Sequence, residues 1–337
     1  MGRRRYIDWM RGIAVLCMIE HHTFDAFLTP SLHGTAPDRF FRFVGGIAAP
    51  SFLFLAGLAA AFALERRPGG VRKMAVRALW IFAGAYLFRL QEWALAFGGS
   101  PWTDLLRIDI LNCIGVALLL VVGAFALRAR FLGYLLMAVA VVAVSPLIRA
   151  ADLSGWPMHL AGYLNGSSPG ALFPLFPWMA HAFAGAALGV LLARVPREDE
   201  PVFFTVISAA ALLVWFGTRF LDGLPFGVYP AMDWWQTSPA YFVLRNCTSV
   251  WLLALCWLAD RALPQGSMRD PLLKLGQHSL VVYWVHIELV YGRWLWRLRG
   301  KMDLLQGAAA LAAVVALMIG LSYLIEWRPA RRLEPAT

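Results

Sequence analysis

The chain has 337 residues, of which 60% are hydrophobic and only 15% are charged. Ordinary soluble domains carry about 25% charged residues, so this composition excludes them and indicates a protein embedded in a lipid bilayer. The net charge of +10 does not predict nucleic-acid binding, because Arg and Lys lie between apolar segments instead of along one stripe. No polar segment is long enough for a separate soluble domain, so we predict one membrane domain over residues 1–337.

The N-terminus resembles a signal peptide, because Arg3–Arg5 precede an apolar stretch. Asp8, Arg11 and Glu20 interrupt that stretch, however, and no small-residue cleavage site closes it. We therefore predict a retained first transmembrane helix.

Apolar segments long enough to cross a bilayer recur along the whole chain, since one crossing needs about 20 residues. They predict an all-α, polytopic membrane helix bundle of about ten transmembrane helices. The candidate spans are 8–28, 43–64, 74–97, 107–127, 131–149, 171–194, 202–221, 240–260, 274–293 and 303–326.

Basic residues set the predicted orientation, because they concentrate in cytoplasmic loops. The loops on the opposite side, 29–42, 98–106, 150–170 and 222–239, are richer in Gly, Pro and Trp. We expect both termini in the cytoplasm of a multi-pass protein of the cell inner membrane. The segments assigned to the cytoplasm are Arg3–Arg5, Glu65–Lys73, Arg128 with Arg130, Arg194 with Arg197, Arg261–Lys274 and Arg328–Arg332.

One basic loop falls on the other side of the predicted membrane. Arg293, Arg297, Arg299 and Lys301 alternate there with tryptophans. Two interpretations stay open: an interfacial aromatic and basic belt, or a binding patch for an anionic headgroup or acceptor.

The first span carries the densest group of ionisable residues, which are costly in a membrane and therefore mark functional sites. At about 100° per residue, Asp8, Arg11, His22 and Asp25 fall on one helix face, and Glu20 points nearly opposite. Arg11 and His22 are about 16 Å apart along the axis at 1.5 Å per residue. One face thus presents a cation near the cytoplasm and an imidazole near the other side.

This pattern suits acyl transfer, in which a hydroxyl or amine loses a proton as it attacks a thioester. We predict His22 as the general base, with Asp25 three residues later as the carboxylate that orients its ring. The structural alternative places His21 and His22 at the membrane interface without a chemical role, and His21, on another face, fits that alternative better.

Other spans also contain charged groups. Arg89 interrupts the third span and Arg245 the eighth; with Arg11, they either hold anionic groups or close internal ion pairs. His286 and Glu288 in the ninth span resemble half a metal site, but no third ligand has useful spacing, so we expect no metal. The cysteines have no metal-ligand spacing and are expected to be free thiols.

Several motifs resemble one family in order and spacing. Asp8 to Met18 match the pattern D-x-x-R-G-x-A-x-x-x-M, and Pro50 to Gly57 match P-x-F-x-F-x-x-G. These residues resemble the heparan-α-glucosaminide N-acetyltransferase-like family of transmembrane acyltransferases, most specifically over residues 5–65. Arg11 and His22 are separated by ten residues, as in the related acyltransferase-three family. Further matches are Arg107–Val116, Phe176–Trp178 with Gly185, and Gly276–Leu280 with Tyr283 and His286.

The resemblance implies a bundle of ten or more helices with a tunnel that acetyl-CoA enters from the cytoplasm. It implies that His33 corresponds to the catalytic histidine of the family and that His22 takes the position of a polar catalytic partner. His33 also has a plain alternative as an exposed loop histidine beside Gly34. The predicted catalytic residues are His22, His33 and Asp25; the predicted acyl-CoA-binding residues are Asp8, Arg11, Arg89, Arg245 and His286.

The function hypothesis is transfer of a short acyl group from cytoplasmic acyl-CoA to a glycan, glycolipid or other amine or hydroxyl acceptor at the extracytoplasmic face. The alternative is a transporter or channel in which His22, Asp25 and His286 relay protons. We expect the lipid bilayer, acyl-CoA and the acceptor as partners, no nucleic acid, and a homodimer as one open oligomeric state.

Overall fold

The computed structural model describes residues 4–97, 99–168, 170–222, 229, 233–263 and 269–327. Within these residues the chain is helical, and extended pairing is limited to one isolated bridge between Leu28 and Met302. The predicted all-α fold is therefore confirmed. The α-helices are α1 (Arg5–Phe27), α2 (Ala36–Gly45), α3 (Ala48–Arg66), α4 (Val71–Leu95), α5 (Ile110–Ala126), α6 (Phe131–Ala150), α7 (Met158–Asn165), α8 (Leu175–Arg194), α9 (Glu200–Asp222), α10 (Pro239–Ala262), α11 (Arg269–Gln277), α12 (Ser279–Tyr291) and α13 (Leu304–Trp327).

Every predicted span coincides with a helix or a pair of helices. Among the described residues, seven helical segments are long and apolar enough to cross a membrane by length and composition. The predicted spans in α1 and α4 fall outside this set and carry several charged residues, and α12 is too short. Multi-pass membrane character is thus supported, whereas the count of ten crossings stays a prediction.

The orientation also stays a prediction. Arg3 and the tail Arg328–Arg332, which contributed to it, lie outside the described residues, as do parts of the loops 222–239 and 261–274.

The chain divides into two compact units. Unit 1 comprises residues 1–48 and 256–337, and unit 2 comprises residues 49–255. The prediction of one functional domain over 1–337 is not tested by this division.

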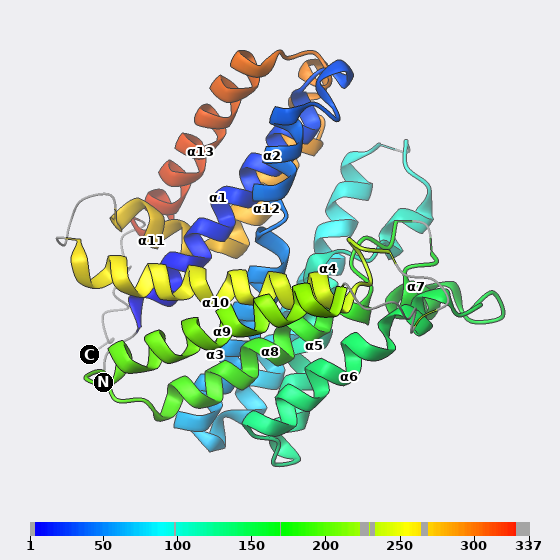
Figure 1. The fold of residues 1–337 in the computed structure, drawn as a ribbon. Helices are drawn as coiled ribbons and strands as arrows, with labels where there is room; N and C mark the ends of the chain where they lie inside the picture. The colour runs from blue at the N-terminus through cyan, green and yellow to red at the C-terminus, as the bar shows by residue number, and fades with distance from the viewer. Residues whose placement is uncertain are drawn as a thin grey trace, which may run out of the picture. The chain divides into compact units, whose positions relative to one another are not determined.

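In unit 1, α1 contacts α2, α11, α12 and α13 (Figure 1). The contact with α11 depends on two glycines. A Cβ at Gly12 would overlap the carbonyl oxygen of Leu272, and a Cβ at Gly276 would overlap that of Asp8. Small residues of this kind let helix backbones approach closely in membranes. This packing fixes the helix that carries most of the predicted site.

The C-terminal end of α1 is held by the segment that precedes α13. The backbone N–H of Gly300 donates to the carbonyl of Ala26 (3.0 Å), and that of Thr29 donates to the carbonyl of Met302 (3.0 Å). These two hydrogen bonds fix the start of the segment 28–35, which follows α1 and contains His33.

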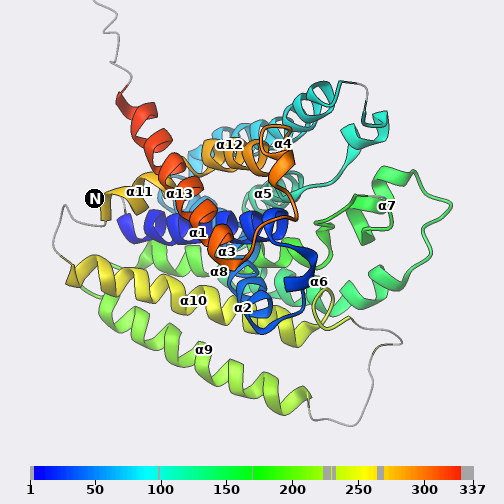
Figure 2. The ribbon, with the colours of Figure 1, turned by 90° about the horizontal axis from the view of Figure 1, so that it is seen from above.

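In unit 2, α5 contacts α4, α6 and α8, and α8 contacts α6 and α7 (Figure 2). Asp109 and Asn112 form a capping box that starts α5 at Ile110, three residues later than the predicted span. The helices α3 and α8 approach closely at glycines: a Cβ at Gly57 would overlap the carbonyl of Ala182, and one at Gly185 the carbonyl of Phe54.

Candidate functional site

A hydrogen-bonded chain of two imidazoles joins α1 to α12 in unit 1. His22 Nδ1 lies 2.9 Å from Nε2 of His286, and the two rings are nearly parallel, at 10°. The other nitrogen of His286, Nδ1, lies 2.8 Å from the carbonyl oxygen of Val282, one turn earlier on α12. His286 has no exposed surface, so its ring is fixed by packing as well as by both hydrogen bonds.

These contacts determine which nitrogen carries each proton when both rings are neutral. A carbonyl oxygen only accepts, so His286 donates from Nδ1 and its Nε2 carries a lone pair. That lone pair accepts the N–H of His22 Nδ1. Nε2 of His22 is then unprotonated, and it has no hydrogen-bond partner among the described residues. His22 therefore presents a proton acceptor whose tautomer is set by His286.

Asp25 has a different hydrogen-bond partner from the predicted one. It was expected to orient His22, but its carboxylate oxygen Oδ2 accepts a hydrogen bond from the hydroxyl of Tyr291, at 2.7 Å. The ring of Tyr291 contacts the ring of His22 edge-on, with 5.4 Å between centroids. Asp25 thus belongs to the same cluster through Tyr291, while the hydrogen-bond partner of His22 is His286.

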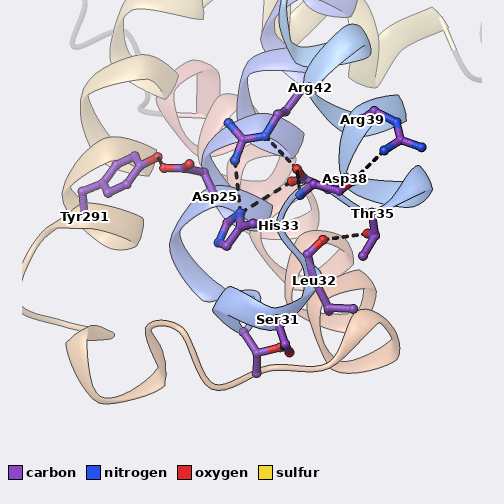
Figure 3. A network of polar contacts seen from close by, with 11 residues as sticks. Asp25, Ser31, Leu32, His33, Thr35, Asp38, Arg39, Arg42 and Tyr291 are labelled. Carbon is purple, nitrogen blue, oxygen red and sulfur yellow. Dashed lines mark hydrogen bonds and ion pairs between the residues drawn. The ribbon is translucent and has the colours of Figure 1, made fainter.

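His33 ends a short 3₁₀ turn, Pro30–Leu32, and lies beside the first turns of α2 (Figure 3). Its Nδ1 is 3.1 Å from Nη2 of Arg42 and 3.7 Å from Oδ1 of Asp38. Asp38 accepts hydrogen bonds from Arg42 Nε, at 2.9 Å, and from the backbone N–H of Gly34, at 2.8 Å. Gly34 has a φ of +79°, a conformation that suits glycine.

At the other end of α1, Asp8 and Arg11 form an i, i+3 ion pair, at 3.0 Å. Asp8 is buried, and the Arg11 side chain keeps 21% of its surface exposed. This contact favours the ion-pair alternative for Arg11, and its predicted contact with CoA stays a prediction.

Arg89 and Arg245 lie in unit 2. Arg89 is buried between two carboxylates, with Nη2 at 2.5 Å from Asp109 and Nη1 against Glu92. Arg245 is buried too, and its Nε donates to the hydroxyl of Tyr241 at 2.8 Å. Both arginines have internal partners, which favours the ion-pair and packing alternative; their assignment to acyl-CoA binding stays untested.

The predicted site residues are therefore divided between the units. Unit 1 contains Asp8, Arg11, His22, Asp25, His33 and His286, and unit 2 contains Arg89 and Arg245. All four cysteines are free. In the described part of the chain, no three His, Cys, Asp or Glu side chains gather as metal ligands would.

The sequence analysis did not identify three polar residues that contact the predicted site residues: Asp38, Arg42 and Tyr291. Asp38 and Arg42 are an i, i+4 pair on one helix turn, five and nine residues after His33. That spacing is a readable signal once a helix is placed at residues 36–45. Tyr291 gave no such signal, because its partner Asp25 lies 266 residues earlier.

The comparison with protein families gives one match that bears on this geometry. Residues 3–221 match the family described as heparan-alpha-glucosaminide N-acetyltransferase, catalytic. The matched region contains α1 with His22 and Asp25, and it ends in α9. It also contains the His33 cluster, which consists of His33, Gly34, Asp38 and Arg42. A comparison with curated proteins found no match.

Proposed function

We propose, because the chain belongs to the heparan-alpha-glucosaminide N-acetyltransferase family, that it is a multi-pass membrane acetyltransferase that uses acyl-CoA. An acetyl or other short acyl group moves from CoA on the cytoplasmic side. It is transferred to an amine or hydroxyl of a sugar or glycolipid at the extracytoplasmic face. The membrane in this proposal is the cell inner membrane.

The observation that carries the proposal is the chain from Val282 through His286 to His22, which leaves Nε2 of His22 as a proton acceptor. The acceptor's amine or hydroxyl attacks the thioester carbonyl carbon and loses its proton to this nitrogen. When the carbon–sulfur bond breaks, the CoA thiolate leaves and takes that proton from His22. His286 holds the ring and tautomer of His22 throughout.

The position of Arg11 supports entry of CoA from the predicted cytoplasmic end of α1. CoA carries several phosphates, and a guanidinium is the side chain best suited to bind them. Arg11 is partly exposed and is positioned by Asp8. It therefore provides a preformed cation about 16 Å from His22 along the same helix.

The central experiment measures transfer of a labelled acetyl group from acetyl-CoA to an amino sugar by the purified protein in lipid. We expect His22→Ala to lower the transfer rate by about 10²-fold or more, which is the contribution of general-base catalysis. His159→Ala, in α7 of unit 2, is the matched control and should transfer at the wild-type rate. A His22→Ala variant that is folded and fully active would contradict the assignment of the base.

The transporter or channel alternative rests on the same pair of imidazoles, since a hydrogen-bonded chain also conducts protons. Thermal stability in the presence of CoA separates the two. An acetyltransferase should be stabilised by CoA, and Arg11→Ala should abolish that stabilisation. A folded protein with no response to CoA would favour transport.

The proposed route is direct transfer from CoA to the acceptor, and the alternative route passes through an acyl-histidine intermediate. Incubation of the protein with labelled acetyl-CoA in the absence of acceptor distinguishes them. We expect no acetylated protein to accumulate; an isolable acyl-enzyme would replace the direct route.

A further inference from the structure

The His33 cluster of unit 1 has the residues of a histidine–carboxylate pair, but its geometry is different. In such a pair the carboxylate accepts the N–H of one imidazole nitrogen and leaves the other nitrogen as a base. Here Asp38 Oδ1 is 3.7 Å from Nδ1 of His33, which is beyond hydrogen-bonding distance. Arg42 Nη2 is the closer partner, at 3.1 Å.

The contact with Arg42 fixes the protonation of the ring. A guanidinium has five N–H donors and no acceptor, so Nδ1 of His33 must supply the lone pair. The proton of the neutral ring is then on Nε2. Nε2 of His33 is therefore a hydrogen-bond donor, whereas Nε2 of His22 is an acceptor.

Arg42 is itself held in place by its neighbours. Its Nε donates to Oδ2 of Asp38 one turn earlier on α2, at 2.9 Å. The same oxygen accepts the N–H of Gly34, at 2.8 Å, which ties the loop of His33 to α2 (Figure 3). Asp38 therefore positions Arg42 and the loop instead of accepting from the imidazole.

The helices α1, which carries His22, and α2, which carries Arg42, pack against each other in unit 1. The ring of His22 contacts Tyr291, and Tyr291 donates to Asp25. The rings of Phe24 on α1 and Phe41 on α2 are 4.2 Å apart between centroids, and Figure 3 shows His33 and Arg42 beside Asp25 and Tyr291. The proton acceptor on α1 and the N–H donor beside α2 are thus held by two helices in direct contact.

We propose that Arg42 is a positioning residue that holds His33 as the Nε2–H tautomer. His33 then donates a hydrogen bond to the carbonyl oxygen of the acyl thioester, while His22 accepts the proton of the attacking amine or hydroxyl. The inference rests on the proposed acyl transfer for its catalytic part. The attack on the thioester forms the new carbon–nitrogen or carbon–oxygen bond and moves the carbonyl electron pair to oxygen. Nε2–H of His33 stabilises that oxygen until the carbon–sulfur bond breaks, and the oxygen returns to a carbonyl.

The first test reads the tautomer directly. Nitrogen NMR of protein labelled with ¹⁵N-histidine distinguishes a protonated ring nitrogen from one with a lone pair, and His33→Gln identifies the His33 signals. We expect Nε2 of His33 to be protonated in the wild type. Arg42→Ala should move the proton to Nδ1, toward Asp38, whereas Arg42→Lys should keep it on Nε2 because the ammonium also only donates.

Arg39→Ala is the matched control. Arg39 is on the same helix and donates to the carbonyl of Gly34, at 2.6 Å, but has no contact with the ring. The Arg39→Ala substitution removes the same charge as Arg42→Ala and should leave the tautomer of His33 unchanged. A wild-type ring protonated on Nδ1, or a tautomer that Arg42→Ala does not change, would overturn the inference.

The second test concerns the reaction. Loss of one donor to a developing oxyanion costs about 10²–10³-fold in kcat, so Arg42→Ala should lower kcat toward that range, with partial rescue by Arg42→Lys. Full kcat in Arg42→Ala with a switched tautomer would refute the catalytic part. Absence of acetyl transfer in the wild type would refute the proposed function and leave the NMR result for Arg42 to stand by itself.

Discussion

The chemistry of the two site histidines is decided by which atom touches Nδ1 of each ring. Nδ1 of His22 faces a lone pair on His286, and Nδ1 of His33 faces a donor on Arg42. Two identical side chains therefore acquire opposite hydrogen-bonding roles from single neighbours. Sequence reasoning found both histidines but left the division of labour between them open.

His286 is the residue whose substitution tests this account at the position of His22. His286→Leu removes the acceptor of the His22 N–H, so the ring loses its fixed tautomer, and acetyl transfer should fall by about 10-fold or more. His286→Gln offers a side-chain oxygen that accepts the same N–H and should retain more activity. The measurement is kcat/KM for acetyl-CoA in variants of equal thermal stability.

Asp25→Asn provides the contrast. Its hydrogen-bond partner is Tyr291 instead of His22, so it should reduce transfer less than His286→Leu. If Asp25→Asn were the more damaging change, the originally predicted pairing of Asp25 with His22 would be the better description.

Arg89 illustrates a residue whose burial makes it a stability determinant. Removing one member of a buried ion pair costs about 3–5 kcal/mol, because the remaining charge is left uncompensated. We expect Arg89→Met to lower the free energy of unfolding by about that amount, since it leaves both Asp109 and Glu92 without this partner. Thermal denaturation in detergent measures the change.

Arg130→Met is the control for Arg89. The Arg130 side chain is 45% exposed and pairs with Glu65 at 3.2 Å. Exposed ion pairs contribute about 0–1 kcal/mol, so the shift in Tm should be much smaller. Equal shifts for the two variants would contradict the role of burial.

At the scale of helices, close backbone approach explains several of the motif glycines. Gly12 and Gly276 lie between α1 and α11, and Gly57 and Gly185 lie between α3 and α8. Each was noticed in a family-like motif, and each has a neighbouring carbonyl where a Cβ would be. Their place in the motifs therefore reflects close packing between helices as much as chemistry.

Gly185→Ala tests this packing in unit 2. The new methyl group would overlap the backbone of Phe54, and overpacking of this kind costs about 1–3 kcal/mol. The Tm should fall. Gly123→Ala, in α5, has nothing within 4 Å of its Cβ and should be neutral or slightly stabilising, because alanine favours helix. A Gly185→Ala protein as stable as Gly123→Ala would show that α3 and α8 adjust freely.

At the scale of the whole chain, the distribution of basic residues predicts which loops lie on each side of the membrane. The positive-inside pattern places the loop 150–170 outside and the turn after α8 inside. An impermeant maleimide should label Ser154→Cys in intact cells, and Glu198→Cys only after permeabilisation. The unsubstituted protein provides the background from its own cysteines, and the reverse labelling pattern would invert the predicted orientation.

The sequence by itself determined the membrane class, the helices and the region of the site. Hydrophobic segments of bilayer length specify helices locally, and the spacing of Asp8, Arg11, His22 and Asp25 places them on one helix through its period alone. The family signature lay in the same region. These properties follow from residues close together in the chain.

Only the tertiary structure decided the partners. His286 lies 264 residues after His22, and Tyr291 lies 266 residues after Asp25, so neither pairing has a local signal. Arg42 is near His33 in sequence, yet whether Arg42 or Asp38 lies within hydrogen-bonding distance of Nδ1 of His33 depends on how the loop with Gly34 meets α2. Protonation of an imidazole is set by the atoms within hydrogen-bonding distance, and those atoms are brought together by folding.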